Sequence, residues 1–391
     1  MSAIVPALMA AGLVQEAVFW YAGWRGEAVL LAPGVWVALV GFSIVATRGC
    51  VDYILFWPKF ERSLARKVAV IGYDQHAVTI AKRVNDASQY GSDVVGIFGD
   101  ASIGHEQSGP EGSIQDLIDL SRRSRLDTII IALPPGRGHE NNVAALLWQL
   151  RSVAADVLVA SYLMHGPNIL LPTQAVGPMS FSVLQRRPLS EIQALCKGCF
   201  DYFASVLLLI PLAFLFLAVA IAIKLDSPGP ILFCQPRFGL NNRQFTVFKF
   251  RTMFINQTDL MAERQTSRGD PRVTRVGKWL RRLSIDEMPQ IFNVLRGEMS
   301  LIGPRPHAPQ TRIDGELLDD VLVEYIMRYR VKPGITGWAQ VNGARGQLMK
   351  AEDLRKRVRY DLDYIQHWSL LFDLKIMALT LLREVISKHA F

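Results

Sequence analysis

The chain has 391 residues, enough for two or three domains with cores of their own, and 50% of its residues are hydrophobic although its formal net charge is +8 at pH 7. An apolar chain with surplus Lys and Arg favours contact with an anionic membrane surface or with phosphate-bearing substrates. Its four cysteines are too few for a disulfide framework, and it contains no recognition-helix, RNP-like or zinc-finger pattern, so we expect no nucleic-acid partner.

Two apolar runs occupy the first 46 residues. The second, residues 29–46, contains no charge and is long enough to span a bilayer, whereas Gln15 and Glu16 interrupt the first. No basic stretch precedes the first run, which argues against a cleaved signal peptide. We therefore predict N-terminal membrane helices within residues 1–60. Basic residues follow the second run and place the next part of the chain in the cytoplasm by the positive-inside bias: Arg48, Lys59, Arg62, Arg66 and Lys67.

Short β-branched runs then alternate with amphipathic segments across residues 61–185. This rhythm predicts a parallel sheet with helices on its faces, so we expect a Rossmann-like α/β module. Near its end, residues 164–186 are rich in Gly and Pro and indicate either a linker or an extension of the sheet edge. The predicted strands are residues 68–71, 94–97, 128–131 and 157–159.

A single glycine, Gly72, follows the first predicted strand. Asp74 and Ala77 stand where the dinucleotide-binding fingerprint requires further glycines, so the fingerprint fails. We therefore predict that the module serves docking or regulation, with self-association into a homodimer as its expected role. A bound NAD is the alternative.

The longest apolar run, residues 203–223, is uncharged and long enough to span a bilayer. Pro211 lies near its middle, where proline removes a helical hydrogen bond and clashes with the preceding turn, so we expect a kink. Basic residues flank both sides, whereas a through-span should show asymmetry. The run therefore predicts a re-entrant membrane helix over residues 201–224 that breaks at Pro211 and returns to the same face. A kinked through-span is the alternative.

Two adjacent carboxylates, Asp286 and Glu287, lie in a stretch rich in arginine. Ser284 or Asp286 followed by Pro289 predicts a helix start, where free N–H groups favour carboxylates and phosphates. Neighbours on a helix are roughly 100° apart, so the two side chains would not share one proton. One is predicted to face a reacting phosphorus and the other a metal ion. The structural alternative is a capping box formed by Ser284 and Glu287.

Several loops rich in Gly and Pro surround this pair in the sequence, and each presents an Arg or Lys. Such rigid cationic loops suit a substrate with several phosphates, because Arg binds phosphate oxygens in a bidentate manner. Residues 276–283 form an amphipathic segment with Trp and basic residues suited to a lipid headgroup layer. The loops contain residues 235–239, 248–253, 270–274, 303–306 and 332–338.

Five motifs in order carry a family resemblance: Lys-Phe-Arg-Thr-Met, Asp-Pro-Arg-Val-Thr, Asp-Glu-x-Pro-Gln, Gly-Pro-Arg-Pro and Lys-Pro-Gly-x-Thr-Gly. From about Arg187 onward the chain is similar to bacterial sugar transferases, the monotopic polyprenyl-phosphate phosphoglycosyl transferases that begin surface polysaccharide assembly. The larger members, which the N-terminal part resembles, include undecaprenyl-phosphate glucose-1-phosphate and galactose-1-phosphate transferases. Ile210 departs from the Ser that often precedes the membrane proline, and there is room for two N-terminal helices rather than four.

The resemblance implies a mixed α/β catalytic domain over residues 186–391 and a two-step displacement that requires Mg²⁺. Asp286 matches the nucleophile, which attacks the β-phosphorus of a UDP-sugar and expels UMP. Glu287 matches the residue that helps to hold Mg²⁺. Polyprenyl phosphate then takes the sugar phosphate from Asp286. The implied phosphate-binding positions are Lys249, Arg251, Arg281, Arg305 and Pro306.

The sequence therefore predicts an α/β membrane enzyme of exopolysaccharide or capsule biosynthesis. It would transfer a hexose 1-phosphate, with glucose favoured over galactose, from a UDP-sugar to undecaprenyl phosphate. The predicted location is the bacterial cytoplasmic membrane, with the catalytic domain on its cytoplasmic face and in contact with membrane lipid. Two alternatives are a non-catalytic membrane scaffold for polysaccharide assembly and a glycosyltransferase that releases UDP.

Overall fold

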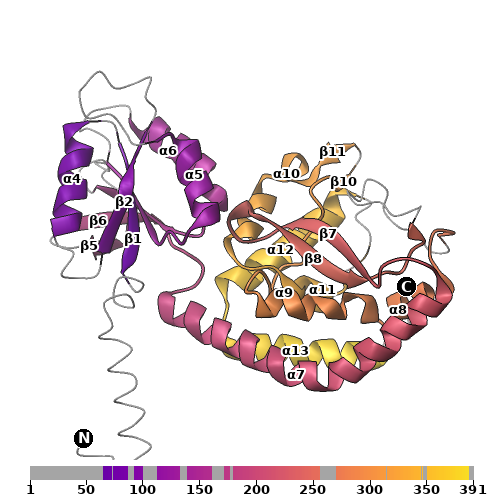
Figure 1. Ribbon diagram of the computed structural model, residues 1–391. Coiled ribbons are helices and arrows are strands. Elements are labelled where there is room, and N and C mark those ends of the chain that lie inside the picture. Colours follow the sequence, from indigo (N-terminus) through magenta and orange to yellow (C-terminus); the bar gives the residue numbers. More distant parts are fainter. Residues whose placement is uncertain are drawn as a thin grey trace, which may run out of the picture. The chain divides into compact units, whose positions relative to one another are not determined.

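The computed structural model describes residues 65–72, 74–86, 92–99, 112–132, 139–160, 171–176, 179–255, 270–313, 315–344, 346 and 350–386. The chain divides into two compact units, Met1–Ala65 and Arg66–Phe391. The membrane helices predicted for residues 1–60 lie outside the described residues. Within the second unit we distinguish a sheet module, residues 66–185, from a C-terminal domain, residues 191–386 (Figure 1).

The sheet module contains six strands in the order β2-β1-β3-β4-β6-β5. The first four are parallel, and β6 pairs antiparallel with both β4 and β5. The four predicted strands are confirmed. Residues 173–176 and 179–185 extend the sheet edge, which was one of the two interpretations of this stretch. The strands are β1 (Arg66–Ile71), β2 (Ser92–Phe98), β3 (Thr128–Ile131), β4 (Asp156–Ala160), β5 (Thr173–Val176) and β6 (Met179–Gln185).

Helices cover both faces of this sheet, which explains why its strands are continuous apolar runs. Val68 and Val70 of β1 pack on the side of α4 (Gln75–Asp86). Ala69 and Ile71 pack on the side of α5 (Ile114–Arg123) and α6 (His139–Gln149), with the short helix η3 (Leu150–Ser152) after α6. Figure 1 shows α4 on one side of the sheet and α5 with α6 on the other.

Gly72 lies where α4 and β3 approach the end of β1. A Cβ at this position would lie 2.5 Å from the Ala77 Cβ and 2.7 Å from the Ala132 carbonyl oxygen. The glycine therefore has a packing reason that does not depend on a nucleotide. The NAD alternative and the homodimer contact stay predictions.

The C-terminal domain mixes helices with short strands, so the predicted α/β class is confirmed. It begins with α7 (Glu191–Asp226), which is followed by the antiparallel hairpin of β7 (Leu232–Phe238) and β8 (Gln244–Phe250). The strands β9 (Ser300–Ile302) and β12 (Gly334–Thr336) pair in parallel beside it. The other elements are η5 (Leu240–Asn242), α8 (Arg275–Arg282), η7 (Ile285–Gln290), α9 (Ile291–Leu295), β10 (Arg312–Ile313), β11 (Glu316–Leu317), α10 (Leu318–Val321), η8 (Val323–Arg330), α11 (Trp338–Val341), α12 (Ala351–Gln366) and α13 (Leu370–Ile386).

The predicted membrane segment forms one helix of 36 residues, α7, that contains Pro211. Among the described helices it alone is long and apolar enough to cross a membrane by length and composition, with a mean hydropathy of 3.1 over 18 residues. Figure 1 shows that α7 curves beneath the domain. Its residues carry large exposed apolar side chains, including Phe214, which is 80% exposed.

Both halves of α7 contact the same domain. In the first half, Lys197 Nζ lies 2.7 Å from Asp373 Oδ2 of α13. In the second half, the Phe216 ring meets the Phe250 ring edge-on, with centroids 5.3 Å apart. At the end of the helix, the Asp226 carboxylate accepts a hydrogen bond from the Val276 N–H of α8. The chain therefore returns to the domain that it leaves.

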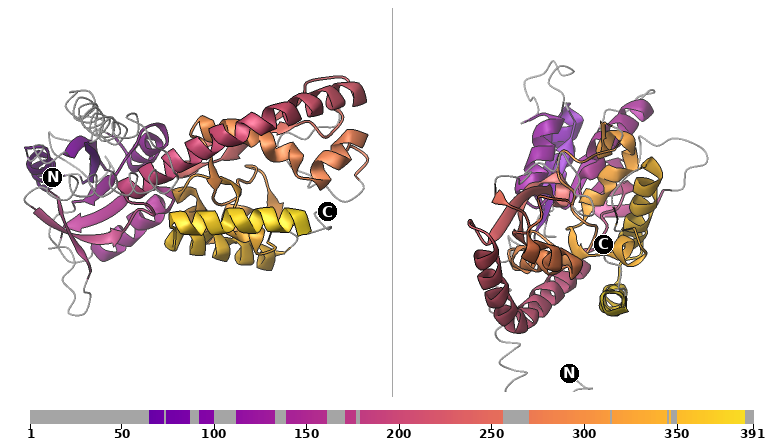
Figure 2. Two further views of the ribbon diagram at one scale, coloured as in Figure 1. Left: turned by 90° about the horizontal axis from the view of Figure 1, so that it is seen from below. Right: turned by 90° about the vertical axis from the view of Figure 1, so that its right-hand side faces the viewer.

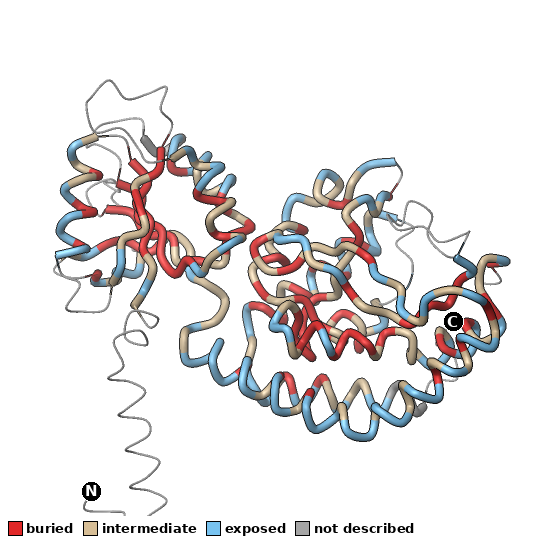
Figure 3. Tube along the Cα trace, in the orientation of Figure 1, coloured by how far each residue is buried: buried red, intermediate tan, exposed pale blue. Residues whose placement is uncertain are grey.

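Helices α7 and α13 lie on the same side of the C-terminal domain (Figures 1 and 2). Most of α7 is exposed along this side (Figure 3). Helix α13 adds further large apolar side chains, including Leu371, which is 77% exposed. Contiguous exposed apolar surface of this kind marks a site of contact with a partner or a membrane.

Candidate functional site

Four separate elements bring the predicted site residues together. Lys249 comes from β8, Asp286 and Glu287 come from η7, and Arg305 comes from the loop after β9. Arg281 comes from the last turn of α8, directly before η7. The site therefore lies where the β-hairpin, the helical stretch 275–295 and the loop after β9 meet.

Glu287 is the buried centre of this cluster. Its carboxylate accepts hydrogen bonds from both terminal nitrogens of Arg305, with Nη1 2.7 Å from Oε2, and from Lys249 Nζ at 3.1 Å. Bidentate pairing of this type is among the strongest in proteins. The Glu287 charge raises the pKa of Arg305, whereas burial lowers the pKa of Lys249 against the pull of Glu287. Two cations therefore hold one carboxylate in place.

Asp286 differs from its neighbour because its side chain is only partly buried. Removal from water, followed by the nearby charge of Glu287, raises the pKa of Asp286 to about 6, although Lys249, Arg281 and Arg305 oppose this shift. Within the described part of the chain, no hydrogen bond or ion pair engages its carboxylate. Asp286 is thus a carboxylate available for chemistry beside one that Lys249 and Arg305 hold in place.

The helix start predicted at these residues is confirmed, but it is a 3₁₀ helix rather than an α-helix. Ser284 precedes it in the left-handed conformation, with φ 56°, and makes no side-chain capping hydrogen bond. The capping-box alternative is therefore wrong. The left-handed turn redirects the backbone between α8 and η7, so that the Glu287 side chain meets Lys249 and Arg305.

Close contact between two glycine-containing loops fixes the position of Arg305. The Gly303 N–H donates to the Thr336 carbonyl at 2.9 Å, and the Gly334 N–H donates to the Pro304 carbonyl at 3.0 Å. A Cβ on Gly334 would lie 2.1 Å from the Gly303 nitrogen, so no other residue fits. Pro306 then restricts the backbone immediately after Arg305.

Thr252, just after the end of β8, holds the Arg281 side chain in place. Its Nε donates to Thr252 Oγ1 at 2.8 Å. The helix α8 sits tightly on this strand end, because a Cβ on Gly277 would lie 2.2 Å from the Thr252 carbonyl oxygen. Burial lowers the pKa of Arg281, and the charge of Asp286 is the strongest influence opposing the shift. Arg281 is therefore placed to balance the charge of Asp286.

Arg251, also predicted to bind phosphate, lies apart from this cluster. Its buried guanidinium donates to the Ser227 carbonyl at 2.7 Å and the Pro228 carbonyl at 2.6 Å, just beyond the end of α7. No contact among the described residues joins it to Asp286 or Glu287. Arg251 thus anchors the end of α7, and its phosphate contact stays a prediction.

Arg237 of β7 belongs to this site although it was not among the predicted site residues. Burial, assisted by the charge of Arg305, lowers the pKa of Arg237 to about 10. Cross-strand pairing sets Arg237 opposite Phe245 and Lys249 opposite Phe233, so the two cations share one face of the hairpin. The Gln-Pro-Arg sequence of β7 could have identified Arg237, because residues 235–239 were already predicted to form a cationic loop.

A second group of residues that was not predicted from the sequence packs behind Arg305. Arg328 donates to the Arg305 carbonyl at 2.8 Å and pairs with the buried Asp361 at 2.7 Å. His307 contacts the Tyr325 hydroxyl through Nδ1 at 2.6 Å and Arg357 through Nε2 at 2.8 Å. Burial and the surrounding arginines hold the pKa of His307 well below its usual range, so the ring is neutral. Its position directly after Pro-Arg-Pro was the available signal.

The site has the oxygen ligands for one kind of metal site. Among the described residues no group of three His, Cys, Asp or Glu side chains could enclose a metal ion. Mg²⁺, however, is commonly bound by one or two carboxylates together with substrate phosphates and water. The adjacent carboxylates of Asp286 and Glu287 fit that type of site.

Comparison with known proteins matches residues 192–387 to the family "Bacterial sugar transferase". The undecaprenyl-phosphate glucose phosphotransferase of Komagataeibacter xylinus is 52% identical over 91% of this chain and 66% of its own length. The UDP-glucose:undecaprenyl-phosphate glucose-1-phosphate transferase of Escherichia coli K12 is 34% identical over 91% of this chain and 75% of its own length. A UDP-N-acetylgalactosamine-undecaprenyl-phosphate N-acetylgalactosaminephosphotransferase of Aeromonas hydrophila is 44% identical over 49% of this chain and 44% of its own length.

Proposed function

Because the chain belongs to the bacterial sugar transferase family, we propose that it transfers glucose 1-phosphate from UDP-glucose to undecaprenyl phosphate and releases UMP. Three relatives that share 91–92% of this chain have names that specify glucose and undecaprenyl phosphate. The structural observation that carries the proposal is the carboxylate of Asp286, which lies beside the occupied carboxylate of Glu287 and has a pKa of about 6. At neutral pH it is ionised and can act as a nucleophile.

The proposed reaction has two displacements at one phosphorus. An Asp286 oxygen bonds to the β-phosphorus of UDP-glucose, and the bond from that phosphorus to the bridging oxygen breaks, so UMP leaves with the electron pair. An oxygen of undecaprenyl phosphate then bonds to the same phosphorus, and the bond to Asp286 breaks. The products are a polyprenyl diphosphate glucose and a restored carboxylate.

The protein's main task in this chemistry is to mask negative charge. A carboxylate approaches a charged diphosphate only when nearby cations offset the repulsion. Lys249, Arg281 and Arg305 all oppose the raised pKa of Asp286, so they lie close enough to act on its charge. We propose that Glu287, with the substrate phosphates, holds Mg²⁺, which supplies further charge neutralisation at the diphosphate when bound.

We also propose that α7 is a re-entrant helix that holds the domain on the cytoplasmic face of the inner membrane. The contacts of both halves of α7 with the same domain support this topology, as does Pro211 within the helix. Trp279 of α8 is 63% exposed next to the site, where an indole ring suits the headgroup layer. A site at that level could receive a lipid phosphate.

The experiment that tests the function uses the purified full chain in detergent with undecaprenyl phosphate and UDP-glucose, UDP-galactose or UDP-N-acetylglucosamine. We expect UMP release, fastest with UDP-glucose, and a sugar-phosphate adduct on the protein detectable by mass spectrometry. Asp286→Asn should lower UMP release by roughly a thousand-fold or more and abolish the adduct. Asp320→Asn, an exposed carboxylate in the same domain, should leave both unchanged.

Each alternative gives a different result. Release of UDP would show direct glycosyl transfer, and normal turnover by Asp286→Asn would overturn the nucleophile assignment. If no sugar nucleotide yields UMP while the protein is folded, the scaffold alternative is favoured.

A further inference from the structure

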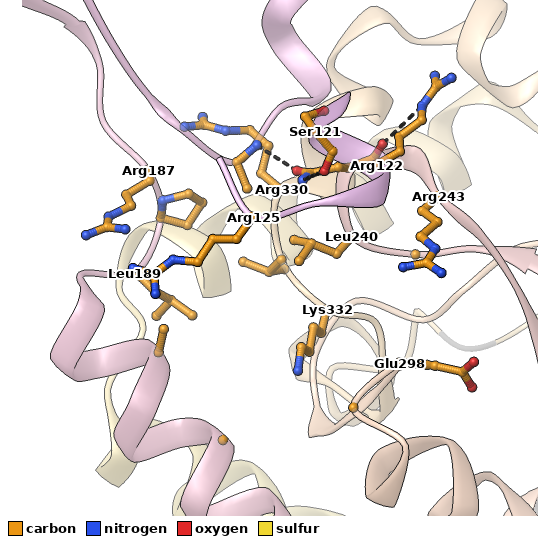
Figure 4. A pocket seen from close by; sticks show the side chains of 18 of the residues that line it. Ser121, Arg122, Arg125, Arg187, Leu189, Leu240, Arg243, Glu298, Arg330 and Lys332 are labelled. Atoms are coloured by element: carbon orange, nitrogen blue, oxygen red, sulfur yellow. Dashed lines mark hydrogen bonds between the residues drawn. The ribbon is translucent and has the colours of Figure 1, made fainter. Parts of the chain in front are cut away.

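A cavity of about 600 Å³ lies where the sheet module meets the C-terminal domain. The sheet module contributes residues 121–127 to its wall, and the C-terminal domain contributes the segments around 239–245, 296–298 and 330–332 (Figure 4). None of Lys249, Arg281, Asp286, Glu287 and Arg305 lines it. It is therefore separate from the site described above.

Asn241 fixes one wall of this cavity. Its Nδ2 donates to the Ser121 carbonyl at 2.7 Å, and its Oδ1 accepts from the Ala154 N–H at 2.8 Å. The residue is buried and takes the left-handed conformation, with φ 55°, which Asn tolerates better than most residues. A specific junction between the two parts of the chain thus shapes the cavity.

The lining carries a large excess of positive charge. Nine basic and three acidic residues line the cavity, and the acids already have partners. Asp127 pairs with Arg125 and Arg187, Asp201 pairs with Lys197, and Glu298 accepts a hydrogen bond from Asn293.

Three of the basic residues, Arg243, Arg330 and Lys332, have no carboxylate within ion-pair distance in the described part of the chain. Figure 4 shows the Glu298 carboxylate pointing away from Lys332. An anion in this cavity would find cationic partners that are not already neutralised.

Burial adds to the demand for an anion. Arg330 and Lys332 are half-buried, and burial lowers the pKa of both. Asp201 opposes the shift of Lys332, but Lys197 already shares that carboxylate. Asp156 opposes the shift of Arg330, but no ion pair joins the two among the described residues. The Arg330 Nε is buried without a hydrogen-bond partner among the described residues. Partly buried cations without an ion-pair partner of their own are unfavourable, so a bound anion would stabilise this arrangement.

Apolar side chains line other parts of the same cavity, including Leu189, Leu240, Phe245 and Trp368. Its volume falls within the range of about 300–1,000 Å³ that is typical of small-molecule sites. Cations that bind phosphate, combined with an apolar surface that covers a flat ring, match the chemistry of a nucleotide.

The position of the cavity distinguishes it from the usual nucleotide site of such a sheet. Open α/β sheets bind ligands beyond the carboxyl ends of their parallel strands. Asp127 directly precedes β3 and Ala154 precedes β4, so this cavity lies at the amino ends. It is therefore unrelated to the position beside Gly72, where the alternative of a bound NAD would place the cofactor.

We propose that this cavity is a binding site for a soluble nucleotide, with Arg243, Arg330 and Lys332 contacting its phosphates. The test measures binding of ATP, GTP and inorganic tripolyphosphate to the full chain in detergent by titration calorimetry, with EDTA present. At least one of the two nucleotides should bind with Kd below about 1 mM and more tightly than tripolyphosphate, which lacks the ring.

The variant Arg243→Gln with Lys332→Gln should weaken this binding about tenfold or more, because it removes two charge-assisted contacts. The matched control Lys356→Gln with Arg359→Gln removes the same charge from exposed positions of α12 and should change Kd less than twofold. Arg243 is exposed, so Arg243→Gln alone keeps the fold and should also weaken binding.

Three outcomes would overturn the proposal. They are no nucleotide binding at about 1 mM, an equal loss of affinity in the control variant, and tripolyphosphate binding as tight as that of the nucleotides.

Discussion

The sheet module and the C-terminal domain differ in how many charged side chains they bury. The described core of the sheet module is almost wholly apolar, and Asp127 is its buried charged residue. The C-terminal domain buries Glu287, Arg328, Arg357, Asp361 and Asp373 among its described residues. Burying a charge is unfavourable unless it is paired and hydrogen-bonded. The domain that accepts this cost also holds Asp286, whose pKa is raised by burial and by the neighbouring Glu287, and such perturbed groups mark functional sites.

The largest effect that would test this contrast comes from breaking the pair of Arg328 and Asp361, whose side chains are 3% and 2% exposed. Arg328→Met leaves Asp361 buried without its partner, which should lower the free energy of unfolding by about 3–5 kcal/mol. Arg66→Met, in β1 of the sheet module, breaks an exposed pair with Glu191 at the start of α7 and should cost less than about 1 kcal/mol. Urea titration of tryptophan fluorescence measures both changes, and equal shifts would contradict the contrast.

A second, smaller effect concerns Arg305 and its role in catalysis. Arg305→Met removes the bidentate partner of Glu287 and a cation near Asp286, so kcat/KM for UMP release should fall about 100-fold. Arg312→Met, at an exposed position of the same domain, should change the rate less than twofold. Steady-state UMP release under the conditions used for Asp286→Asn makes the measurement. A loss of less than tenfold in the Arg305 variant would argue against its role at the phosphates.

The sequence was a better guide to the sheet module than to the charged cluster. Runs such as 128–131 predict buried strands because both faces of a parallel sheet are covered, which is a local pattern. The adjacent Asp286 and Glu287 are also a local signal. By contrast, Lys249 and Arg251 belong to the same motif, and strand alternation would place both on one face. Arg251 instead meets the end of α7 because β8 ends at Phe250.

The layer behind Arg305 could not be predicted from local patterns at all. Arg328, Asp361 and His307 are far apart in the sequence and meet only after η8 and α12 pack against the loop that follows β9. That loop is positioned in turn by the contact of Gly303 with Gly334. Long-range partners of this kind depend on the packed backbone, which motif spacing does not specify.

The pH dependence of the reaction tests the raised pKa of Asp286 in the C-terminal domain. Asp286 acts as a carboxylate, and its pKa of about 6 means that the rate should fall about tenfold per pH unit below that value. Arg281→Met removes a cation that lowers the pKa of Asp286, so the acid limb should move to higher pH. Single-turnover UMP release between pH 5 and 8 measures the limb. A limb that moves to lower pH in this variant would contradict the assignment.

The smallest predicted effect compares the two regions at a helix start. Ser284 before η7 has φ 56°, a conformation that costs a non-glycine residue roughly 1–2 kcal/mol, whereas Ser113 before α5 has φ −79° and caps its helix by accepting from the Asp116 N–H. Ser284→Gly should therefore raise the free energy of unfolding, but by less than about 1 kcal/mol, because glycine gains freedom in the unfolded chain. Ser113→Gly should lower it slightly, since the cap is lost. Urea unfolding of both variants would show changes of opposite sign. The same sign in both would mean that the turn at Ser284 stores no strain, and that the backbone before Asp286 is as relaxed as that of the sheet module.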